Sequence, residues 1–289
     1  MKLLIFGMGY TAQALVQEMR PLPPGTVIGT TRSEDKAAAL RDMGVEARLF
    51  PGTDLRADLE AASHVLITAG PQDGADPVLH HLRPVFADLA PRFDWVGYLS
   101  TTGVYGDHQG GWVDENAALT PATKRGRARV ATESEWQALA RDHGLPLHIF
   151  RLPGIYGPGR GPFEKVRNGT ARRIIKAGQV FSRIHVEDIA QALLASMARP
   201  DPGAIYNICD DDPAPPQDVL TYAAQLLGVD LPPTVPFEEA EMSPMARSFY
   251  AESKRVDNTR MKRELGVRLR YPTYRAGLDA LFAAERDKS

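Results

Sequence analysis

The sequence predicts an α/β fold, a doubly wound parallel sheet with a smaller C-terminal lobe. Short apolar runs alternate with helical patterns through the first two thirds of the chain. Strands that alternate with helices are typical of a parallel sheet covered by helices on both faces. The last third differs, because prolines cluster there, at Pro213, Pro215, Pro216, Pro232, Pro233 and Pro236. We therefore expect this part to build a separate, smaller lobe.

Hydrophobic spacing gives the expected order of elements. Apolar runs predict strands over residues 3–6, 26–30, 46–50, 64–68, 95–100, 146–151 and 204–208. Helical spacing predicts helices over residues 12–19, 33–42, 77–89, 127–142, 185–197, 217–227 and 273–285. Ser33 stands where an N-cap is expected. These elements predict a first domain over residues 1–154, to which residues 181–209 return, and a lobe built from residues 155–180 and 210–289.

Composition excludes several classes of protein. The chain has 289 residues, of which 43% are hydrophobic and 24% charged, so a packed core is expected. The formal net charge of -2, from 34 basic and 36 acidic residues, predicts neither a nucleic-acid partner nor a membrane surface. The single cysteine, Cys209, excludes an internal disulfide and reads as a small core residue. We predict no metal site.

The N-terminus is apolar for only a few residues and then runs into glycines. It therefore predicts a strand and not a signal peptide. No stretch approaches the roughly 18 apolar residues of a membrane span. We expect a soluble, cytoplasmic protein whose partner is a small molecule, with a homodimer left open.

A glycine-rich turn follows the first predicted strand directly and opens the first helix. It reads Gly7-Met8-Gly9-Tyr10-Thr11-Ala12. In a dinucleotide-binding turn the first glycine permits the tight bend and the second lets the backbone approach a pyrophosphate. A small residue such as Ala12 then lets the helix pack closely on the strand, and the free N–H groups of the helix face the phosphates. The turn predicts a Rossmann-like dinucleotide site.

The residues at the end of the second predicted strand indicate whether the dinucleotide is NAD or NADP. It reads Thr31-Arg32-Ser33, whereas an NAD site usually has an acidic residue here to hold the ribose 2′-hydroxyl. The planar guanidinium of Arg32 suits a 2′-phosphate, and the two hydroxyls add donors. NADP is therefore predicted over NAD. At the end of the fourth strand, Ala69 and Gly70 are small enough to let the adenosine half pass close to the backbone.

Three further motifs stand in order along the chain. They are Leu99-Ser100-Thr101-Thr102-Gly103-Val104-Tyr105-Gly106, the run from Arg151 to Arg160, and the run from Phe181 to Ala190. Together with the glycine turn they resemble the extended short-chain dehydrogenase/reductase family, in its NAD-dependent epimerase/dehydratase branch. The resemblance implies a nicotinamide cofactor and a substrate held between the nucleotide domain and the smaller lobe.

The family's usual catalytic set is incomplete in this sequence. The resemblance implies a Ser or Thr that polarises the substrate oxygen, a Tyr that moves the proton, and a Lys four residues later that lowers the Tyr pKa. Thr101 matches the first position. Arg125 stands where the Tyr is expected and Arg129 where the Lys is expected. Because arginine stays protonated, Arg125 is a poor acid–base group, although Arg129 remains a candidate to hold the cofactor ribose.

Several functions remain open on these residues. One is an NADP-dependent oxidoreductase in which Thr101 orients the substrate oxygen and Tyr105 replaces the missing acid–base tyrosine, with packing as the other reading of Tyr105. Thr102, Arg125 and Arg183 would then bind a small substrate that is anionic or sugar-like. A second is a catalytically silent NADP-binding protein that acts as a redox sensor or scaffold. A third is an isomerase or dehydratase that uses its bound cofactor without net redox change.

Overall fold

A seven-stranded parallel sheet forms the centre of the protein in the computed structural model, which describes residues 1–287. The strands lie in the order β11-β7-β5-β4-β1-β2-β3. Every neighbouring pair in this sheet is parallel. This order, which reverses beside β1, is that of a Rossmann-like doubly wound sheet, so the predicted fold class is confirmed. The strands are β1 (Leu3–Phe6), β2 (Val27–Thr31), β3 (Glu46–Leu49), β4 (His64–Ile67), β5 (Trp95–Thr101), β7 (Leu147–Leu152) and β11 (Ile205–Asn207).

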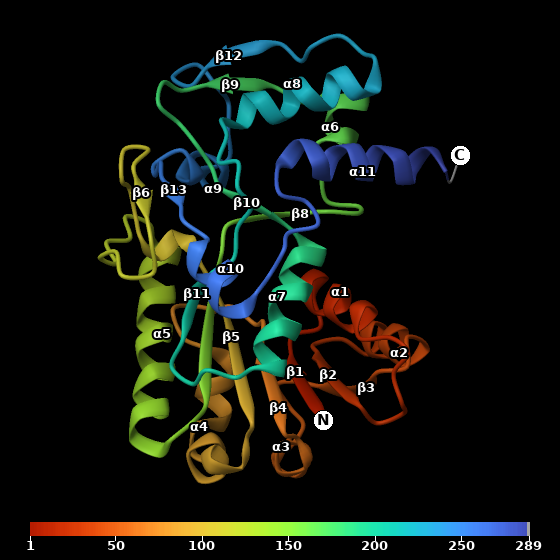
Figure 1. Ribbon diagram of the computed structural model, residues 1–289, viewed down its shortest axis with the longest axis vertical. Helices are drawn as coiled ribbons and strands as arrows, with labels where there is room; N and C mark the ends of the chain where they lie inside the picture. Colours follow the sequence, from red (N-terminus) through yellow and green to blue (C-terminus); the bar gives the residue numbers. More distant parts are fainter. Residues whose placement is uncertain (288–289) are drawn as a thin grey trace.

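Helices cover both faces of this sheet, as Figure 1 shows. One apolar cluster joins Leu3 and Ile5 of β1 to α1, α2 and α7, and another joins Leu4 and Phe6 to α3, α4 and α5. Alternate residues of β1 therefore pack into the apolar clusters on opposite faces of the sheet, which explains why the strand is apolar throughout. The helices are α1 (Tyr10–Glu18), α2 (Glu34–Asp42), α3 (Arg56–Ala61), α4 (Pro77–Leu89), α5 (Lys124–His143) and α7 (Val186–Ala198).

Most of the remaining elements gather beyond the carboxyl ends of the strands, at the upper end of Figure 1. The exceptions are α10 (Thr259–Leu265), which contacts α7 and β11, and η1 (Ala90–Arg92), which directly precedes β5. Three small parallel sheets form beyond the carboxyl ends, from the pairs β8–β10, β9–β12 and β6–β13. The strands are β6 (Trp112–Val113), β8 (Gly154–Tyr156), β9 (Arg173–Ile175), β10 (Arg183–His185), β12 (Thr234–Pro236) and β13 (Arg255–Val256). The helices are α6 (Phe163–Arg167), α8 (Pro216–Leu227), α9 (Pro244–Phe249), α10 (Thr259–Leu265) and α11 (Tyr274–Arg286), with short 3₁₀ turns at η1 (Ala90–Arg92) and η2 (Thr102–Val104).

Polar contacts tie the C-terminal segment to the sheet helices. Arg270 forms a bidentate ion pair with Glu18 of α1, at 2.6 and 2.8 Å. The Asp188 carboxylate of α7 accepts the backbone N–H groups of Arg270 and Tyr271, at 2.7 and 3.1 Å. These bonds fix the approach to α11 relative to the helix that follows the glycine turn.

Local signals in the sequence placed most element ends well. Ser33 caps α2, as predicted, by accepting the Lys36 N–H at 3.4 Å. Cys209 is buried, as predicted for a small core residue. The first helix begins at Tyr10, two residues before the predicted start, because Gly9 occupies its N-cap position. The short helices α3, α6, α9 and α10 were not predicted.

None of the helices among residues 1–287 is both long and apolar enough to cross a membrane.

Candidate functional site

The glycine turn has the geometry of an anion-binding loop. Gly7 has φ +94°, and a Cβ atom there would lie 2.8 Å from the Thr68 hydroxyl oxygen and 3.1 Å from the Ala69 nitrogen. Gly9 is the N-cap of α1, and a Cβ atom on it would meet nothing within 4 Å. No side chain caps α1, so the N–H groups of its first turn face open space. A pyrophosphate fits such a cradle, because the helix dipole and the free N–H groups both attract anions.

The other predicted residues of the turn hold it in place. Ala12 lies on α1 and is fully buried in the apolar cluster between this helix and the sheet, as the predicted packing role requires. The Tyr10 hydroxyl donates to the carbonyl oxygen of Pro158 at 3.0 Å, and the Arg160 guanidinium lies 5.6 Å from the centre of the Tyr10 ring. Thr11 lines the cavity described below. The turn is therefore linked directly to the loop that follows β8.

The end of β2 leaves Arg32 exposed and without an ion-pair partner among the described residues. Thr31 is the last residue of β2, and Ser33 uses its oxygen to cap α2. The Gly7 N–H donates to the Thr30 hydroxyl and the Met8 N–H to the Thr30 carbonyl, so the glycine turn and the end of β2 are adjacent. This places a free cation beside the cradle.

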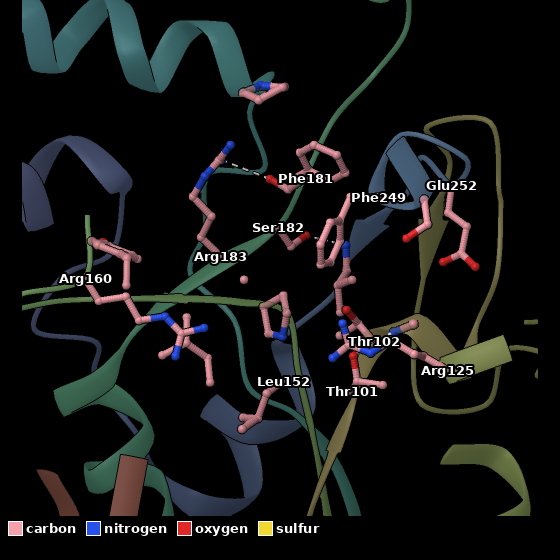
Figure 2. Close-up of a pocket in the computed structure, with 18 of the residues that line it drawn as sticks. Thr101, Thr102, Arg125, Leu152, Arg160, Phe181, Ser182, Arg183, Phe249 and Glu252 are labelled. Atoms are coloured by element: carbon pink, nitrogen blue, oxygen red, sulfur yellow. Dashed lines mark hydrogen bonds between the residues drawn. The ribbon is translucent and has the colours of Figure 1, made fainter. Parts of the chain in front are cut away.

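A cavity of about 890 Å³ extends from the glycine turn into the C-terminal elements. Gly9, Tyr10 and Thr11 line one end of it, and the residues after β5 and at the start of α5 line the middle. Figure 2 shows Thr101, Thr102 and Arg125 on one side and Phe181 and Arg183 on the other. Of the predicted site residues the cavity brings together Gly9, Tyr10, Thr11, Thr101, Thr102, Arg125, Arg129 and Arg183.

Thr101 is the last residue of β5 and Thr102 the first residue of the η2 turn, and both line this cavity. The Thr101 oxygen accepts the N–H of Gly103 at 3.1 Å, which starts the η2 turn and leaves the hydroxyl hydrogen free to donate. Thr102 is 7% exposed and lines the same wall. Both hydroxyls can therefore offer a hydrogen bond to a substrate oxygen.

Arg125 and Arg129 lie one turn apart on α5 but differ in their hydrogen bonding and exposure. Arg129 donates to the Tyr98 hydroxyl at 2.8 Å and to the Leu99 carbonyl at 2.7 Å. It also packs against Gly70, where a Cβ atom would lie 2.5 Å from its guanidinium. Arg125 is exposed and has no hydrogen-bond or ion-pair partner among the described residues. Arg129 is thus fixed to the sheet, and Arg125 is free to bind an anion.

The structure contradicts the prediction that Tyr105 replaces the missing tyrosine. Its side chain is fully buried and does not line the cavity. The hydroxyl donates to Asn207 at 2.7 Å and accepts from Arg151 at 3.0 Å. Burial raises the pKa of Tyr105 to about 12. Because an acid–base group must reach the proton it transfers, the structure gives Tyr105 the packing role that the sequence left open.

Arg183 lines the cavity, and its guanidinium is already hydrogen-bonded to the wall. Its guanidinium donates to the carbonyls of Phe181 and Ala214 at 3.0 and 2.9 Å, and it lies 5.6 Å from the centre of the Tyr274 ring. Burial lowers the pKa of Arg183. These contacts fix the Arg183 guanidinium in the wall of the lobe, with two of its N–H donors bonded to backbone carbonyls.

No motif in the sequence indicates the ion pair that lines the cavity from the C-terminal segment. Lys254 donates to Glu252 at 2.8 Å and to the Gly106 carbonyl at 2.5 Å. Both side chains are about nine-tenths buried. Phe249, Arg160 and Lys165 also line the cavity and were not predicted. Phe249, Glu252 and Lys254 lie far from the motifs in sequence, so only the fold brings them to the site, whereas Arg160 is the last residue of the second motif.

The fold and the glycine turn define a Rossmann-like nucleotide-binding class of protein. The family model of the NAD dependent epimerase/dehydratase family matches residues 91–209, which span β5, α5, β7 and the motifs after them. Residues 91–209 are therefore similar to this family, as the sequence motifs predicted.

Three known proteins show how far this likeness extends. The chain is 58% identical to a functionally unknown conserved protein from Silicibacter pomeroyi DSS, whose structure it matches with a TM-score of 0.92 over 98% of this chain and 99% of that one. It is 29% identical to protein YeeZ of Escherichia coli (strain K12), over 94% of this chain and 96% of the relative. The dTDP-glucose 4,6-dehydratase DesIV of Streptomyces venezuelae, with NAD and TYD bound, shares the fold at 19% identity, with a TM-score of 0.80 over 99% and 97% of the chains.

Proposed function

We propose that the protein is an NADP-dependent oxidoreductase that acts on a small anionic substrate. One observation carries this proposal: a single cavity joins the glycine turn, the threonines after β5 and the free cation Arg125. A dinucleotide held at the turn would extend into the space where a substrate meets these groups. Residues 155–180 and 210–289 would form the lobe that closes over that substrate.

The preference for NADP rests on Arg32. The guanidinium is exposed at the end of β2, beside the cradle, and Thr31 stands where an NAD site usually has a carboxylate. A 2′-phosphate would gain a charge-assisted, bidentate contact there. Gly9, Tyr10 and Thr11 would hold the pyrophosphate through backbone N–H groups, while Arg129, fixed against Gly70, would border the nicotinamide ribose.

The protein's own residues would bind and orient the substrate. The bound nicotinamide supplies hydride chemistry. The Thr101 hydroxyl hydrogen is free and would hydrogen-bond the substrate oxygen beside the reacting carbon. Thr102 would support it, and Arg125 would hold an anionic group of the substrate. With Tyr105 buried and Arg125 unable to exchange a proton at neutral pH, we propose that protonation does not use the family's tyrosine.

Cofactor titration tests the first part of this proposal. Intrinsic fluorescence should show NADPH binding more tightly than NADH. Arg32→Ala should weaken NADPH binding about tenfold or more, since charge-assisted bonds contribute about 1.5–3 kcal/mol, and should leave NADH binding nearly unchanged. Arg41→Ala is the matched control, because Arg41 is exposed on α2 and paired with Glu34. Equal binding of NADPH and NADH to the unaltered protein, with neither affinity changed in Arg32→Ala, would refute the NADP preference.

Turnover tests the second part. NADPH oxidation should be measured with a panel of aldehydes, ketones and unsaturated acids. Thr101→Val should lower turnover of any accepted compound while NADPH affinity stays the same. NADPH binding without turnover on any compound would instead support a silent, cofactor-sensing protein, which the absence of the family's tyrosine at residue 125 also favours.

A further inference from the structure

The cavity has a strongly unbalanced charge. Six cationic side chains and one carboxylate line it, although the chain as a whole has a net charge of -2. Three of the cations are bonded to backbone carbonyls. The other three have no carboxylate partner among residues 1–287: Arg125, Arg160 and Lys165. The single carboxylate, Glu252, is neutralised by Lys254 at 2.8 Å. This cavity therefore favours a ligand that carries negative charge.

Aromatic rings form the opposite part of the wall. Phe249 lines the cavity with 55% of its surface exposed, which is unusual for a phenylalanine. Phe181 and Tyr250 lie beside it along the same wall, with their ring centres 5.7 Å apart in an edge-to-face arrangement. Figure 2 shows Phe249 between Phe181 and the group formed by Thr101, Thr102 and Arg125. Such rings offer a flat apolar surface to a planar ligand.

The lining is poorly suited to a polyhydroxylated ligand. Within the described part of the chain, no Asn, Gln, Asp or His side chain lines the cavity. Sugar hydroxyls are usually recognised by such groups, because each hydroxyl both donates and accepts a hydrogen bond. Glu252, the one carboxylate acceptor, already takes bonds from Lys254 and from the Ala122 N–H at 3.3 Å. The polar groups that remain are hydroxyls and cations.

We propose that the substrate is a small aromatic carboxylate, with its ring against Phe249 and Phe181 and its carboxylate on Arg125. This assignment rests on the proposed oxidoreductase function and specifies its substrate. Arg125 is the cation that discriminates, because it lies beside Thr101 and Thr102. Arg160 lies over the Tyr10 ring next to the glycine turn, where the cofactor's phosphates are expected. Lys165 belongs to α6 on the lobe.

Calorimetric titration of the NADPH-saturated protein tests this assignment. The probes are cinnamate and benzoate, their neutral amides, and UDP-glucose. We expect at least one acid to bind, and its amide to bind at least tenfold more weakly. Arg125→Gln should weaken binding of the acid at least tenfold and leave that of the amide unchanged, whereas Phe249→Ala should weaken both. Arg141→Gln, at the far end of α5, is the matched control.

The outcomes separate this inference from the proposed function. NADPH binding is measured first on each variant, and its failure in the unaltered protein would remove the proposed function itself. If NADPH binds but UDP-glucose binds more tightly than either acid, the substrate assignment is wrong. It is also wrong if neither acid binds, or if Arg125→Gln leaves the affinity for the acid unchanged.

Discussion

Gly7 and Gly9 stand two residues apart in the same turn, yet the structure gives them separate tasks. Gly7 needs a positive φ and close approach to Thr68 and Ala69, so its role is to let the chain fold. Gly9 has an ordinary φ of -87° and faces open space. Its missing side chain matters only when a pyrophosphate occupies that space. One pattern in the sequence thus combines a folding requirement with a binding requirement.

Alanine substitutions separate these two requirements. Gly7→Ala should lower the free energy of unfolding by about 1–3 kcal/mol, because a side chain at φ +94° is strained and its Cβ would meet Thr68. Gly9→Ala should leave stability within about 0.5 kcal/mol but weaken NADPH binding, since its methyl group would enter the cradle. Urea unfolding and fluorescence titration measure the two effects. A large loss of stability in Gly9→Ala would contradict this division.

At this scale the sequence indicated the position of the glycine turn beside the cavity, but not the side chains that the C-terminal segment adds to its wall. The glycine turn and the end of β2 are contiguous motifs, and local chemistry is enough to interpret them. Tyr105 also belongs to a motif, but its buried position depends on hydrogen bonds with Asn207 and Arg151, which lie on other strands. Glu252 and Lys254 carry no motif, and their place depends on how the last third of the chain folds back.

Among the secondary-structure elements, α5 is joined to the sheet by a buried polar network. Glu133 of α5 accepts two bonds from Arg151 of β7, at 3.2 and 2.7 Å, and one from the Ser100 hydroxyl of β5 at 2.5 Å. The exposed fractions of the Arg151 and Glu133 side chains are 3% and 1%. Arg151 continues the network to Tyr105. This network holds the helix that carries Arg125 and Arg129 against the strand that carries Thr101.

Breaking one partner of this network should be costly. Glu133→Ala is expected to lower the free energy of unfolding by about 3–5 kcal/mol, because it leaves the Arg151 charge buried without compensation. Glu133→Leu combined with Arg151→Met should cost less than Glu133→Ala, since the double variant removes both charges. Urea denaturation of the parent protein and the two variants measures this. A Glu133→Ala variant as stable as the parent would show that the ion pair does not hold the helix.

For the whole molecule, the alternation of strands and helices was enough to predict the parallel sheet, but not the architecture of the smaller lobe. The helices α6 and α9 have five and six residues, too few for a clear 3.6-residue pattern. The strands that pair there are two or three residues long and come from distant parts of the chain. Their pairing is set by tertiary packing, so no local signal predicts it.

The free energy of unfolding of the whole molecule should depend on pH, because burial lowers the pKa of two histidines and raises that of one aspartate. Burial lowers the pKa of both His148 and His185 to about 4. The unfolded chain binds protons at these histidines below about pH 6.5 and the folded chain does not, so their contribution to stability is lost as the pH falls from 6.5 to 4. Burial raises the pKa of Asp210 to about 8. The folded chain keeps this proton, so the contribution of Asp210 is lost as the pH rises from 4 to 8.

His185→Asn isolates one of these contributions. His185 caps α7 by accepting the Glu187 N–H at 3.3 Å, and asparagine is also a good N-cap that does not titrate. The variant should be less stable at pH 7, because it loses ring contacts with Tyr156 and Tyr271. Its stability should nevertheless fall less than that of the parent between about pH 7 and about pH 5, by an amount of order 1–2 kcal/mol. Urea unfolding at the two pH values measures this difference. Equal losses in parent and variant would show that His185 is already protonated in the folded protein, or that it titrates alike in both states.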